Sequence, residues 1–419
     1  MIDKDRSARC RVAVVGAGVV GACAAYALRK RGLDVALLER DEPGAGCSFG
    51  NLGAISMSSV VPLATSGTLK TLPSMLSDPD SPLFLPIGYF PRAAPWLVQF
   101  MLSARSKVVE QSSAELARLH DGAVDAHTRL AREIGVPELI VQRGQLHLYP
   151  SNQAFQNDES SWALRSRRGL SFQRLDAAGI AKLEPAIGSR YPVGIFLEGD
   201  ATVLNPGRYV QAIVSAFIAE GGRFVKRNVK RLQRNSDGSW LICSDADLEG
   251  FDHVVIAAGA WSRELLQGVG VRLALESQRG YHVQFSDCAS LVSRSVLLTD
   301  RKVFFAPMEA GLRVGGTVEI AGLDNPPNPR RVAILERIAK DIFPELVGVT
   351  STHWMGHRPC MPDSVPRIGS AGIPGLHMSV GHGHLGLTDS VLSAERIVQS
   401  VLGSSSAEQL NAVKVGLSN

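Results

Sequence analysis

The stretch RVAVVGAGVVGACAAYALRKRGLDVALLER, residues Arg11–Arg40, decides the fold. It predicts a short buried strand, a glycine turn at 16–21, a helix of small residues and a second strand that ends at Glu39. The first glycine allows a tight turn, the second lets the backbone approach a phosphate, and the third lets the helix pack on the strand. The helix N-terminus can bind an anion, and the acid about 20 residues further on can accept a hydrogen bond from a ribose hydroxyl. The pattern predicts a dinucleotide-binding βαβ unit, and the alternative is a glycine-rich turn in another βαβ unit.

The composition is typical of a globular protein and argues against one class of function. The chain has 419 residues, of which 45% are hydrophobic and 20% are charged, so it can form two domains with a large core. The net charge of +4 arises from 44 basic and 40 acidic residues. This balance gives no support to nucleic-acid binding, and the arginine pairs at 167–168 and 330–331 are most simply solvated surface.

The cysteines and the N-terminus indicate the compartment. The six cysteines are scattered and form no CxxC pair, so we predict neither a disulfide framework nor a metal site, and a reducing compartment fits. Residues 1–10 are charged and lack the apolar core of a signal peptide. No apolar run reaches the roughly 18 residues of a membrane span. We therefore expect a cytoplasmic protein.

Two stretches after the first unit have a distinctive composition. Residues 41–56 are rich in glycine and small polar residues. Such a loop can fold over a cofactor and donate N–H groups to it, while a plain surface turn is the alternative. Residues 61–111 contain seven prolines, which forbid a long helix. The apolar run Trp96–Leu102 predicts a short helix that packs in the core, the favoured interpretation, or touches a membrane or a partner.

The middle of the chain predicts strands and helices in turn. Apolar spacing indicates a helix over 113–134, and Asn205 with Pro206 marks the start of a helix over 207–220. Strands are predicted at 144–149, 194–198, 229–232, 240–243 and 251–258, the last ending in a small-residue turn. The strands within 280–317 predict the mixed sheet of a second domain.

The C-terminal part contains a second place where the backbone can approach a ligand. The segment WMGHRPCMPDSVPRIG, residues 354–369, precedes an apolar strand at 376–380 and the sequence GHGHLGLT, residues 381–388. A strand followed by a glycine-rich turn and a helix N-terminus can hold a ring or an anion. Residues from 403 onward are predicted to fray.

These motifs together resemble one family. GAGVVG with Glu39, AAGAW at 257–261, GHRPCMPDSVPRIG at 356–369 and GHGHLGLT at 381–388 are similar to the FAD-dependent D-amino acid oxidase superfamily. The resemblance covers residues 11–402 and is strongest to bacterial D-amino acid dehydrogenases, including D-proline and cis-4-hydroxy-D-proline dehydrogenases.

The resemblance implies an α/β fold. A Rossmann-type FAD-binding domain would be accompanied by a discontinuous α+β substrate domain built on a mixed β-sheet. The FAD-binding domain would comprise residues 1–60, 190–265 and 350–402, the substrate domain residues 61–189 and 266–349, and the tail residues 403–419.

The resemblance also implies noncovalent FAD. Some sarcosine-oxidising relatives attach FAD through a cysteine, but the sequence Pro-Cys-Met-Pro around Cys360 differs from theirs. The implied cofactor residues are Gly16, Ala17, Gly18, Val20 and Gly21 at the pyrophosphate, Glu39 and Arg40 near the adenosine ribose, Ser48, Asn51, Leu52 and Gly53 on the flavin side, Val229 at adenine, Gly259 along the cofactor, and Gly383, His384, Leu385, Gly386 and Thr388 around the isoalloxazine ring.

Three residues are implied in catalysis. Arg358, in a GxRP motif, would clamp the substrate carboxylate, because a planar guanidinium makes two parallel hydrogen bonds. Tyr281 is chosen as its tyrosine partner, since phenylalanines stand at 304 and 305 where some relatives have tyrosine. His384 is a pocket residue, whereas His382 is favoured as a locally hydrogen-bonded loop histidine.

The implied reaction is oxidation of the Cα–N bond of a D-amino acid, with D-proline or cis-4-hydroxy-D-proline as cyclic candidates, to an imine by hydride transfer to flavin N5. The implied partners are the amino acid, a quinone or another respiratory acceptor, and peripherally the inner face of the cell membrane. Three alternatives stay open: a flavoprotein subunit of a hetero-oligomeric amine or opine oxidase, an oxidase of glycine or sarcosine-type substrates, and a non-catalytic NAD-binding regulator.

Overall fold

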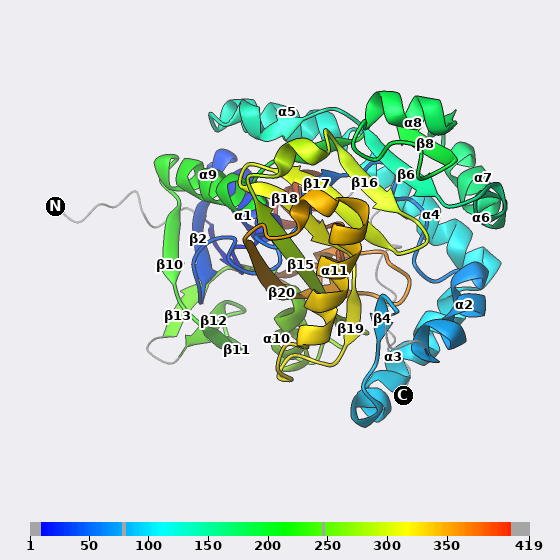
Figure 1. The fold of residues 1–419 in the computed structure, drawn as a ribbon. Coiled ribbons are helices and arrows are strands. Elements are labelled where there is room, and N and C mark those ends of the chain that lie inside the picture. Colours follow the sequence, from blue (N-terminus) through cyan, green and yellow to red (C-terminus); the bar gives the residue numbers. More distant parts are fainter. Residues whose placement is uncertain (1–9, 78–80, 245–247, 404–419) are drawn as a thin grey trace.

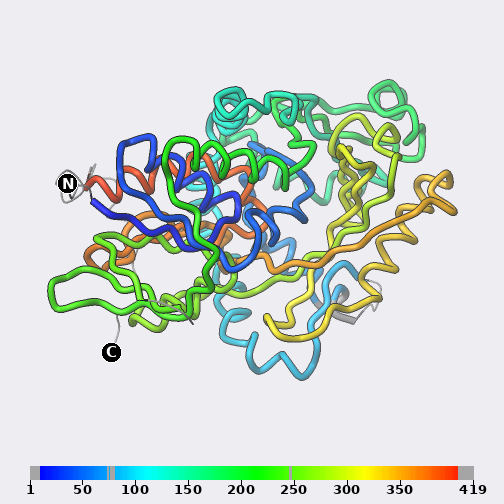
Figure 2. Tube along the Cα trace, turned by 90° about the vertical axis from the view of Figure 1, so that its left-hand side faces the viewer, coloured from blue at the N-terminus to red at the C-terminus, as the bar shows by residue number. Residues whose placement is uncertain are grey.

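The chain folds around two large β-sheets. The structure, a computed structural model, describes residues 10–77, 81–244 and 248–403 (Figure 1); most of the predicted tail, residues 404–419, lies outside this description. In Figure 1 the blue and green strands of the first sheet lie on the left, and the yellow strands of the second sheet lie in the centre. The two ends of the described chain, blue and red, lie side by side in Figure 2.

The first sheet contains the glycine turn. Its strands are, in spatial order, β10 (Arg223–Lys226), β2 (Asp34–Glu39), β1 (Arg11–Val15), β14 (His253–Ile256), β22 (Leu376–Val380) and β21 (Arg367–Ser370). Neighbouring strands are parallel, except that β21 is antiparallel to β22. The predicted strand, glycine turn, helix and strand are confirmed as β1, α1 (Val19–Lys30) and β2.

Both faces of this sheet are covered, as a parallel sheet requires. Val12 and Val14 face a core shared with α1, α9 (Pro206–Ala219) and α12 (Gly386–Val401). Ala13 and Val15 face the opposite core, which contains α10 (Ser262–Gln267) and the small sheet of β11 (Val229–Arg234), β12 (Trp240–Ser244) and β13 (Leu248–Phe251). The strands predicted at residues 229–232 and 240–243 are confirmed, and they form an antiparallel pair.

The second sheet is mixed and has ten strands. The path runs β4 (Leu83–Phe84), β19 (Val318–Ile320), β15 (Glu276–Ser286), β18 (Gly311–Gly315), β17 (Val303–Met308), β16 (Ser295–Leu298), β6 (Gln145–Tyr149), β8 (Val193–Leu197) and β7 (Gln173–Leu175), and β20 (Ser351–Cys360) also pairs with β15. One face packs its apolar side chains on α11 (Pro329–Ile342). The other face carries polar side chains and glycines, among them Gln145, Gly280, Arg313 and Arg358. A three-stranded sheet, β3 (Ala54–Ile55), β9 (Ala201–Val203) and β5 (Ile140–Val141), lies beside the two.

Two strands lie in a different sheet from the one that the expected domain boundaries imply. β8 and β20 belong to the ten-stranded sheet, although residues 190–265 and 350–402 were both expected in the FAD-binding domain. β20 continues through residues 361–366 into β21 of the first sheet, so the chain crosses between the sheets after Cys360. The boundaries themselves stay a prediction.

The remaining α-helices all lie between residues 66 and 183. They are α2 (Ser66–Ser77), α3 (Phe90–Ser103), α4 (Ser106–His120), α5 (Ala123–Glu133), α6 (Asn152–Asn157), α7 (Glu159–Arg167) and α8 (Ala177–Leu183). The single helix predicted over 113–134 is wrong, because Gly122 adopts a left-handed φ of 73° and separates α4 from α5. Within the described ranges, no helix is both long and apolar enough to cross a membrane.

Candidate active site

The glycine turn after β1 brings three segments of backbone close together. Gly16 has a φ of 104°, and a Cβ there would lie 2.4 Å from the carbonyl oxygen of Ala257, the residue that follows β14. A Cβ on Gly21 would lie 1.8 Å from the carbonyl oxygen of Gly16. No larger residue fits at either position, so the first turn of α1 lies directly beside the end of β14.

Glu39 and Ser48 hold this turn from two sides. The Glu39 Oε2 atom accepts a hydrogen bond from the N–H of Ala17 at 2.7 Å, and the Ser48 Oγ atom accepts one from the N–H of Val19 at 2.9 Å. Arg40 follows Glu39, and its guanidinium lies 3.9 Å from the ring centroid of Trp261. The two strand ends therefore form one wall of a cavity.

This cavity, the flavin cradle, has a volume of about 420 Å³. Eleven of the implied cofactor residues line it: Gly16, Gly18, Val20, Glu39, Arg40, Ser48, Asn51, Val229, Gly259, Gly383 and Gly386. Sequence reasoning missed other lining residues, including Cys47, Arg227, Trp261, Glu264, His357 and Leu387. Trp261 belongs to the AAGAW motif and His357 directly precedes Arg358. Their positions within these motifs could therefore have indicated that both residues line the cavity.

The other implied cofactor residues support the cradle from behind. Gly53 has a φ of 76°, its N–H donates to the Asn51 Oδ1 atom at 2.7 Å, and a Cβ on it would lie 2.3 Å from the carbonyl oxygen of Val203. The Thr388 hydroxyl accepts from the N–H of Ser56 at 3.0 Å and donates to the carbonyl of Ala54 at 3.3 Å. Ala17, Gly21, Leu52, Gly53, His384, Leu385 and Thr388 do not line the cavity.

The loop at residues 381–386 connects the cradle to the second sheet. The N–H of Gly383 donates to the carbonyl of Pro359 at 2.8 Å, and His382 forms a β-bridge with Cys360. The His382 Nε2 atom lies 3.2 Å from the hydroxyl of Ser393, which agrees with a locally bonded loop histidine. The strand that carries Arg358 is thereby fixed to the loop that precedes α12.

Arg358 is a cation without an acidic partner. Its Nη1 atom donates to the carbonyl of Thr317 at 3.0 Å, and across the described ranges no carboxylate forms an ion pair with it. Burial lowers the pKa of Arg358, because removal from water disfavours the charged form of the guanidinium. An anion that binds here would restore the missing partner.

His384 lies near this guanidinium. Its side chain is exposed although protein groups surround it, and it does not line the flavin cradle. Burial and the Arg358 charge lower the pKa of His384 to about 4. The imidazole is therefore neutral at pH 7 and can accept or donate one hydrogen bond.

Cys47 and Cys360 lie on the same side of the site, next to Arg358. Burial raises the pKa of the Cys47 thiol to about 11 and that of Cys360 to about 12. Both side chains are thus protonated thiols at neutral pH and weak nucleophiles.

The structure does not bring Tyr281 to Arg358, so the expectation that they clamp one carboxylate together is corrected. Arg358 pairs with Gln278 across the β15–β20 ladder, and Tyr281, three residues from Gln278, points to the opposite face of the sheet. The Tyr281 hydroxyl donates to the carboxylate of Glu319 and accepts from the N–H of Asn328 at 2.9 Å. Both hydrogen-bonding capacities of this hydroxyl are used within the core against α11.

Phe304 is an aromatic residue on the face of the ten-stranded sheet that carries Arg358. It pairs with Gly315, and Gly315 pairs with His282 on β15. Phe304 is only half-buried, whereas its neighbour Phe305 is fully buried in the core on α11. An apolar ring, and no tyrosine hydroxyl, thus faces the side of the sheet that carries Arg358.

The comparison with known families identifies the class of protein. A family model described as "FAD dependent oxidoreductase" matches residues 11–400. The chain belongs to this family and is an FAD-dependent oxidoreductase; the resemblance, the fold class and the FAD cofactor predicted from the sequence are confirmed.

Two curated relatives match over nearly their whole length. The D-amino-acid oxidase of Bradyrhizobium diazoefficiens is 36% identical over 400 residues, which cover 94% of this chain and 95% of the relative. The D-amino acid dehydrogenase 2 of Pseudomonas aeruginosa is 31% identical over 402 residues, with 93% and 94% covered.

Solved structures share the fold at low identity. Glycine oxidase from Geobacillus kaustophilus superposes with a TM-score of 0.74 at 20% identity, covering 98% of this chain and all of its own. L-Proline dehydrogenase from P. horikoshii superposes with a TM-score of 0.72 at 15% identity, with 98% and 96% covered.

The residues of the cradle fit FAD. Positive φ at Gly16 and Gly259 lets the backbone of both strand ends reach the cavity, and α1 begins at Val19 without an acid in its first turn. A Cβ on Gly259 would meet no protein atom within 4 Å, so this glycine borders open space. Such bare backbone at a helix N-terminus suits a pyrophosphate.

Proposed function

We propose that the protein oxidises the Cα–N bond of a D-amino acid to an imine. FAD, when bound in the cradle, supplies the two-electron oxidation. The observation that carries the proposal is the half-buried Arg358, which has no acidic partner among the described residues and lies beside the loop at residues 381–386. The 36% identity to a D-amino-acid oxidase supports the stereochemistry.

The proposed roles of the site residues follow from their geometry. Arg358 binds the substrate carboxylate, and the Thr317 carbonyl fixes one edge of the guanidinium. Phe304 and Leu52 supply apolar surface on the same side of the sheet, where the Leu52 Cδ1 atom lies 3.2 Å from a Cβ placed on Gly315. The substrate binds as the free amine, and the neutral His384 accepts a hydrogen bond from it.

We further propose that FAD is held without a covalent bond. Cys360 is 3% exposed, its carbonyl accepts from Trp96, and its thiol is protonated at neutral pH. Precipitation of the protein with acid and measurement of the supernatant tests this, since a noncovalent flavin is released and a cysteinyl flavin stays in the pellet.

Anaerobic bleaching of the flavin tests the main proposal. The panel contains D- and L-amino acids, glycine, sarcosine, D-proline and cis-4-hydroxy-D-proline. Rapid bleaching by D-amino acids, with the Michaelis constant raised at least a hundredfold in Arg358→Gln, is the expected result. Bleaching by glycine or sarcosine alone would replace the proposal with a glycine-type oxidase. Bleaching by no compound would favour a subunit of a larger enzyme.

The same experiment addresses the electron acceptor. Readmission of air restores the yellow colour quickly in an oxidase and slowly in a dehydrogenase, and a quinone then restores it in the latter. A quinone or another respiratory acceptor stays part of the proposal, supported by the 31% identity to a D-amino acid dehydrogenase.

A peripheral membrane contact is proposed at the outer face of α3. Trp96 and Phe100 pack in the core, as the favoured interpretation expected, but Phe90, Val98, Met101 and Leu102 on the other side are 45–52% exposed. Residues 81–109 contain no acid, whereas Arg92, Arg105 and Lys107 are exposed. An apolar helix face flanked by cations suits an anionic lipid surface.

Cosedimentation with vesicles tests this contact. We expect binding to vesicles with 30% phosphatidylglycerol, at least fivefold weaker binding to pure phosphatidylcholine, and loss of binding in Met101→Ser with Leu102→Ser. Equal binding of this double variant would remove α3 from the contact. Leu248→Ser, a change at a remote exposed leucine on β13, is the matched control.

A further inference from the structure

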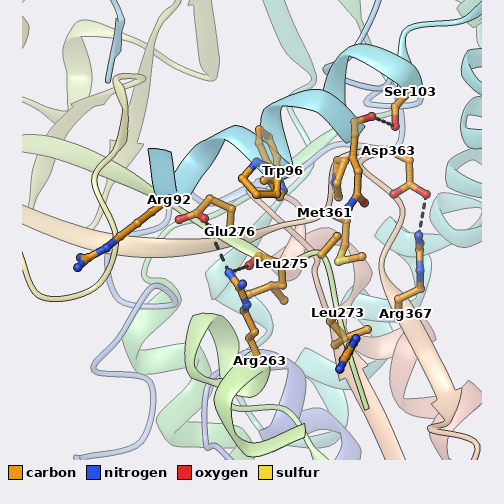
Figure 3. Close-up of a pocket in the computed structure, with 15 residues that line it drawn as sticks. Arg92, Trp96, Ser103, Arg263, Leu273, Leu275, Glu276, Met361, Asp363 and Arg367 are labelled. Atoms are coloured by element: carbon orange, nitrogen blue, oxygen red, sulfur yellow. Dashed lines mark hydrogen bonds and ion pairs between the residues drawn. The ribbon is translucent and has the colours of Figure 1, made fainter. Parts of the chain in front are cut away.

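A second cavity lies outside the flavin cradle. It has a volume of about 470 Å³ and is lined by one face of α3, the connection before β15 and the segment after β20 (Figure 3). The two cavities share no lining residue. The volume falls within the range of small-molecule sites, and nothing in the oxidation of an amino acid requires this cavity.

The floor of this cavity is apolar. Arg92, Trp96, Gln99 and Ser103 follow one face of α3, and Figure 3 shows Trp96 above Glu276 and Leu275. Trp96 is 6% exposed, and its Nε1–H donates to the carbonyl of Cys360 at 3.1 Å. Its indole is therefore fixed, and it forms a rigid apolar surface with Met361, Leu273 and Leu275.

Most of the charges around the cavity are satisfied. The Arg367 Nη2 atom donates to Asp363 at 2.7 Å. Glu276 is 4% exposed and accepts hydrogen bonds from the hydroxyl of Tyr89 at 3.0 Å and from the N–H of Ser277 at 3.1 Å. Arg263 lies 4.0 Å from Glu276 and donates to the carbonyl of Leu275 at 3.3 Å.

Two exposed arginines of the lining have no partner among the described protein groups. Arg92 on α3 and Arg272 before β15 line the cavity, are exposed, and form no hydrogen bond or ion pair with the residues that the structure describes. With four arginines against two carboxylates, the lining carries a formal charge of +2. The excess cations belong to two different elements of the lining.

The cavity also adjoins the loop at residues 381–386. Met361 lines the cavity, and a Cβ placed on Gly381 would lie 2.4 Å from its Cγ atom. α10 supplies Arg263 to this cavity and Glu264 and Leu265 to the cradle. One layer of residues therefore separates the two cavities.

We propose that this second cavity binds a small organic anion, a carboxylate with an apolar or aromatic body, and that its occupancy is transmitted to the flavin through Met361 and Gly381. Arg92 and Arg272 bind the carboxylate, and the body lies on Trp96 and Met361. An inorganic anion would leave the apolar floor in water, and a neutral molecule would leave the two guanidinium groups without a partner.

Calorimetric titration of the FAD-loaded protein with phenylpyruvate tests the site. The titration uses the Arg358→Gln variant, in which the carboxylate clamp of the active site is removed. We expect one molecule bound per chain, with the flavin absorption band shifting along the same saturation curve. The affinity should fall roughly tenfold or more when Arg92→Gln and Arg272→Gln are added.

Two controls make the test decisive. Arg105→Gln removes an exposed arginine just beyond α3 that does not line the cavity, and it should leave the affinity unchanged. Phenylacetone, a neutral ketone of similar size, should bind at least tenfold more weakly.

The proposed site would be refuted by absence of binding, by equal affinity after the loss of Arg92 and Arg272, or by equal binding of phenylacetone. A flavin absorption band that does not respond to the ligand would refute the proposed coupling between the site and the flavin. Because catalysis is silenced, these outcomes do not depend on the amino acid that the enzyme oxidises.

Discussion

The guanidinium of Arg358 lies over the bare backbone of Gly280 on the neighbouring strand. A Cβ on Gly280 would lie 2.2 Å from the Arg358 Cζ atom. The guanidinium can therefore occupy this position only because residue 280 has no side chain.

Gly280→Ala is expected to raise the Michaelis constant for the amino acid roughly ten- to a hundredfold while the FAD content stays unchanged. The added methyl group displaces the guanidinium by about an ångström, and such shifts carry penalties of this size. Steady-state kinetics and the flavin-to-protein absorbance ratio measure the two effects. Gly250→Ala on β13, where the nearest atom would be 3.9 Å away, is the control. An unchanged Michaelis constant in Gly280→Ala would contradict the proposed clamp.

Tyr281→Phe is expected to leave kcat/KM unchanged and to lower the free energy of unfolding by about 1–3 kcal/mol. The change leaves the buried carboxylate of Glu319 and the N–H of Asn328 each without one hydrogen-bond partner. Urea unfolding and steady-state kinetics separate the two effects. A large loss of kcat/KM at full stability would return Tyr281 to the active site.

Gly259→Ala is expected to weaken FAD retention at least tenfold, whereas Gly32→Ala should not affect it. Both glycines have positive φ, 56° and 84°, and at neither would a Cβ meet a protein atom within 4 Å. Both changes therefore cost about 1–3 kcal/mol of backbone strain, but only Gly259 lines the cradle. Flavin fluorescence after dilution measures release, and equal release from both variants would refute a cofactor contact at Gly259.

The protein is expected to lose stability as the pH falls from 7 to 4. Burial lowers the pKa of His127 to about 4 and that of His147 to about 3, against about 6.5 in an unfolded chain. Within this window the unfolded state binds more protons than the folded state, so the free energy of unfolding decreases as the pH is lowered. One histidine shifted to about 4 contributes about 3 kcal/mol.

His127→Gln tests the contribution of one residue. This histidine bonds to the hydroxyl of Tyr209 at 3.0 Å through Nδ1 and is fully buried. The variant should show a shallower slope of unfolding free energy against pH between 4 and 6.5 in urea titrations. An identical slope would show that His127 is not a buried neutral group.

Asp389→Asn is expected to destabilise the protein by about 3–5 kcal/mol. Asp389 lies in the first turn of α12, its Oδ1 atom lies 3.0 Å from the Nε2 atom of His120 of α4, and both side chains are 1% exposed. The change removes the enclosed carboxylate that faces the imidazole. Urea unfolding of the variant and of Glu395→Gln, an exposed acid on the same helix, measures the difference. Equal stability would mean that the pair carries no charge.

Local patterns predicted the parts of the structure that depend on local interactions. The glycine turn requires its three glycines whatever the rest of the chain does, and the Asn205 side chain accepts from the N–H of Arg208 at 3.0 Å, as its place before Pro206 predicted. The orientation of Tyr281 could not be predicted. β15 is buried along ten of its eleven residues, so no alternation of polar and apolar positions marks which face each side chain joins.

Contacts between distant segments were equally invisible in the sequence. Arg40 stacks on Trp261 only because β2 and β14 flank β1 in the same sheet. The break at Gly122 was hidden because the apolar spacing continues on both sides of it. The second cavity forms where α3 meets the ends of β15 and β20, and no motif in any one of these segments indicates it.

The hydrogen bond from Gly383 to Pro359 and the bridge between Cys360 and His382 make the junction of the two sheets stiff. A hinge at this junction would have to break both, and it would separate the substrate clamp from the flavin loop in the same movement. We therefore expect the two halves of the active site to keep one spacing throughout turnover. The rate of substrate entry would therefore not depend on an opening of domains.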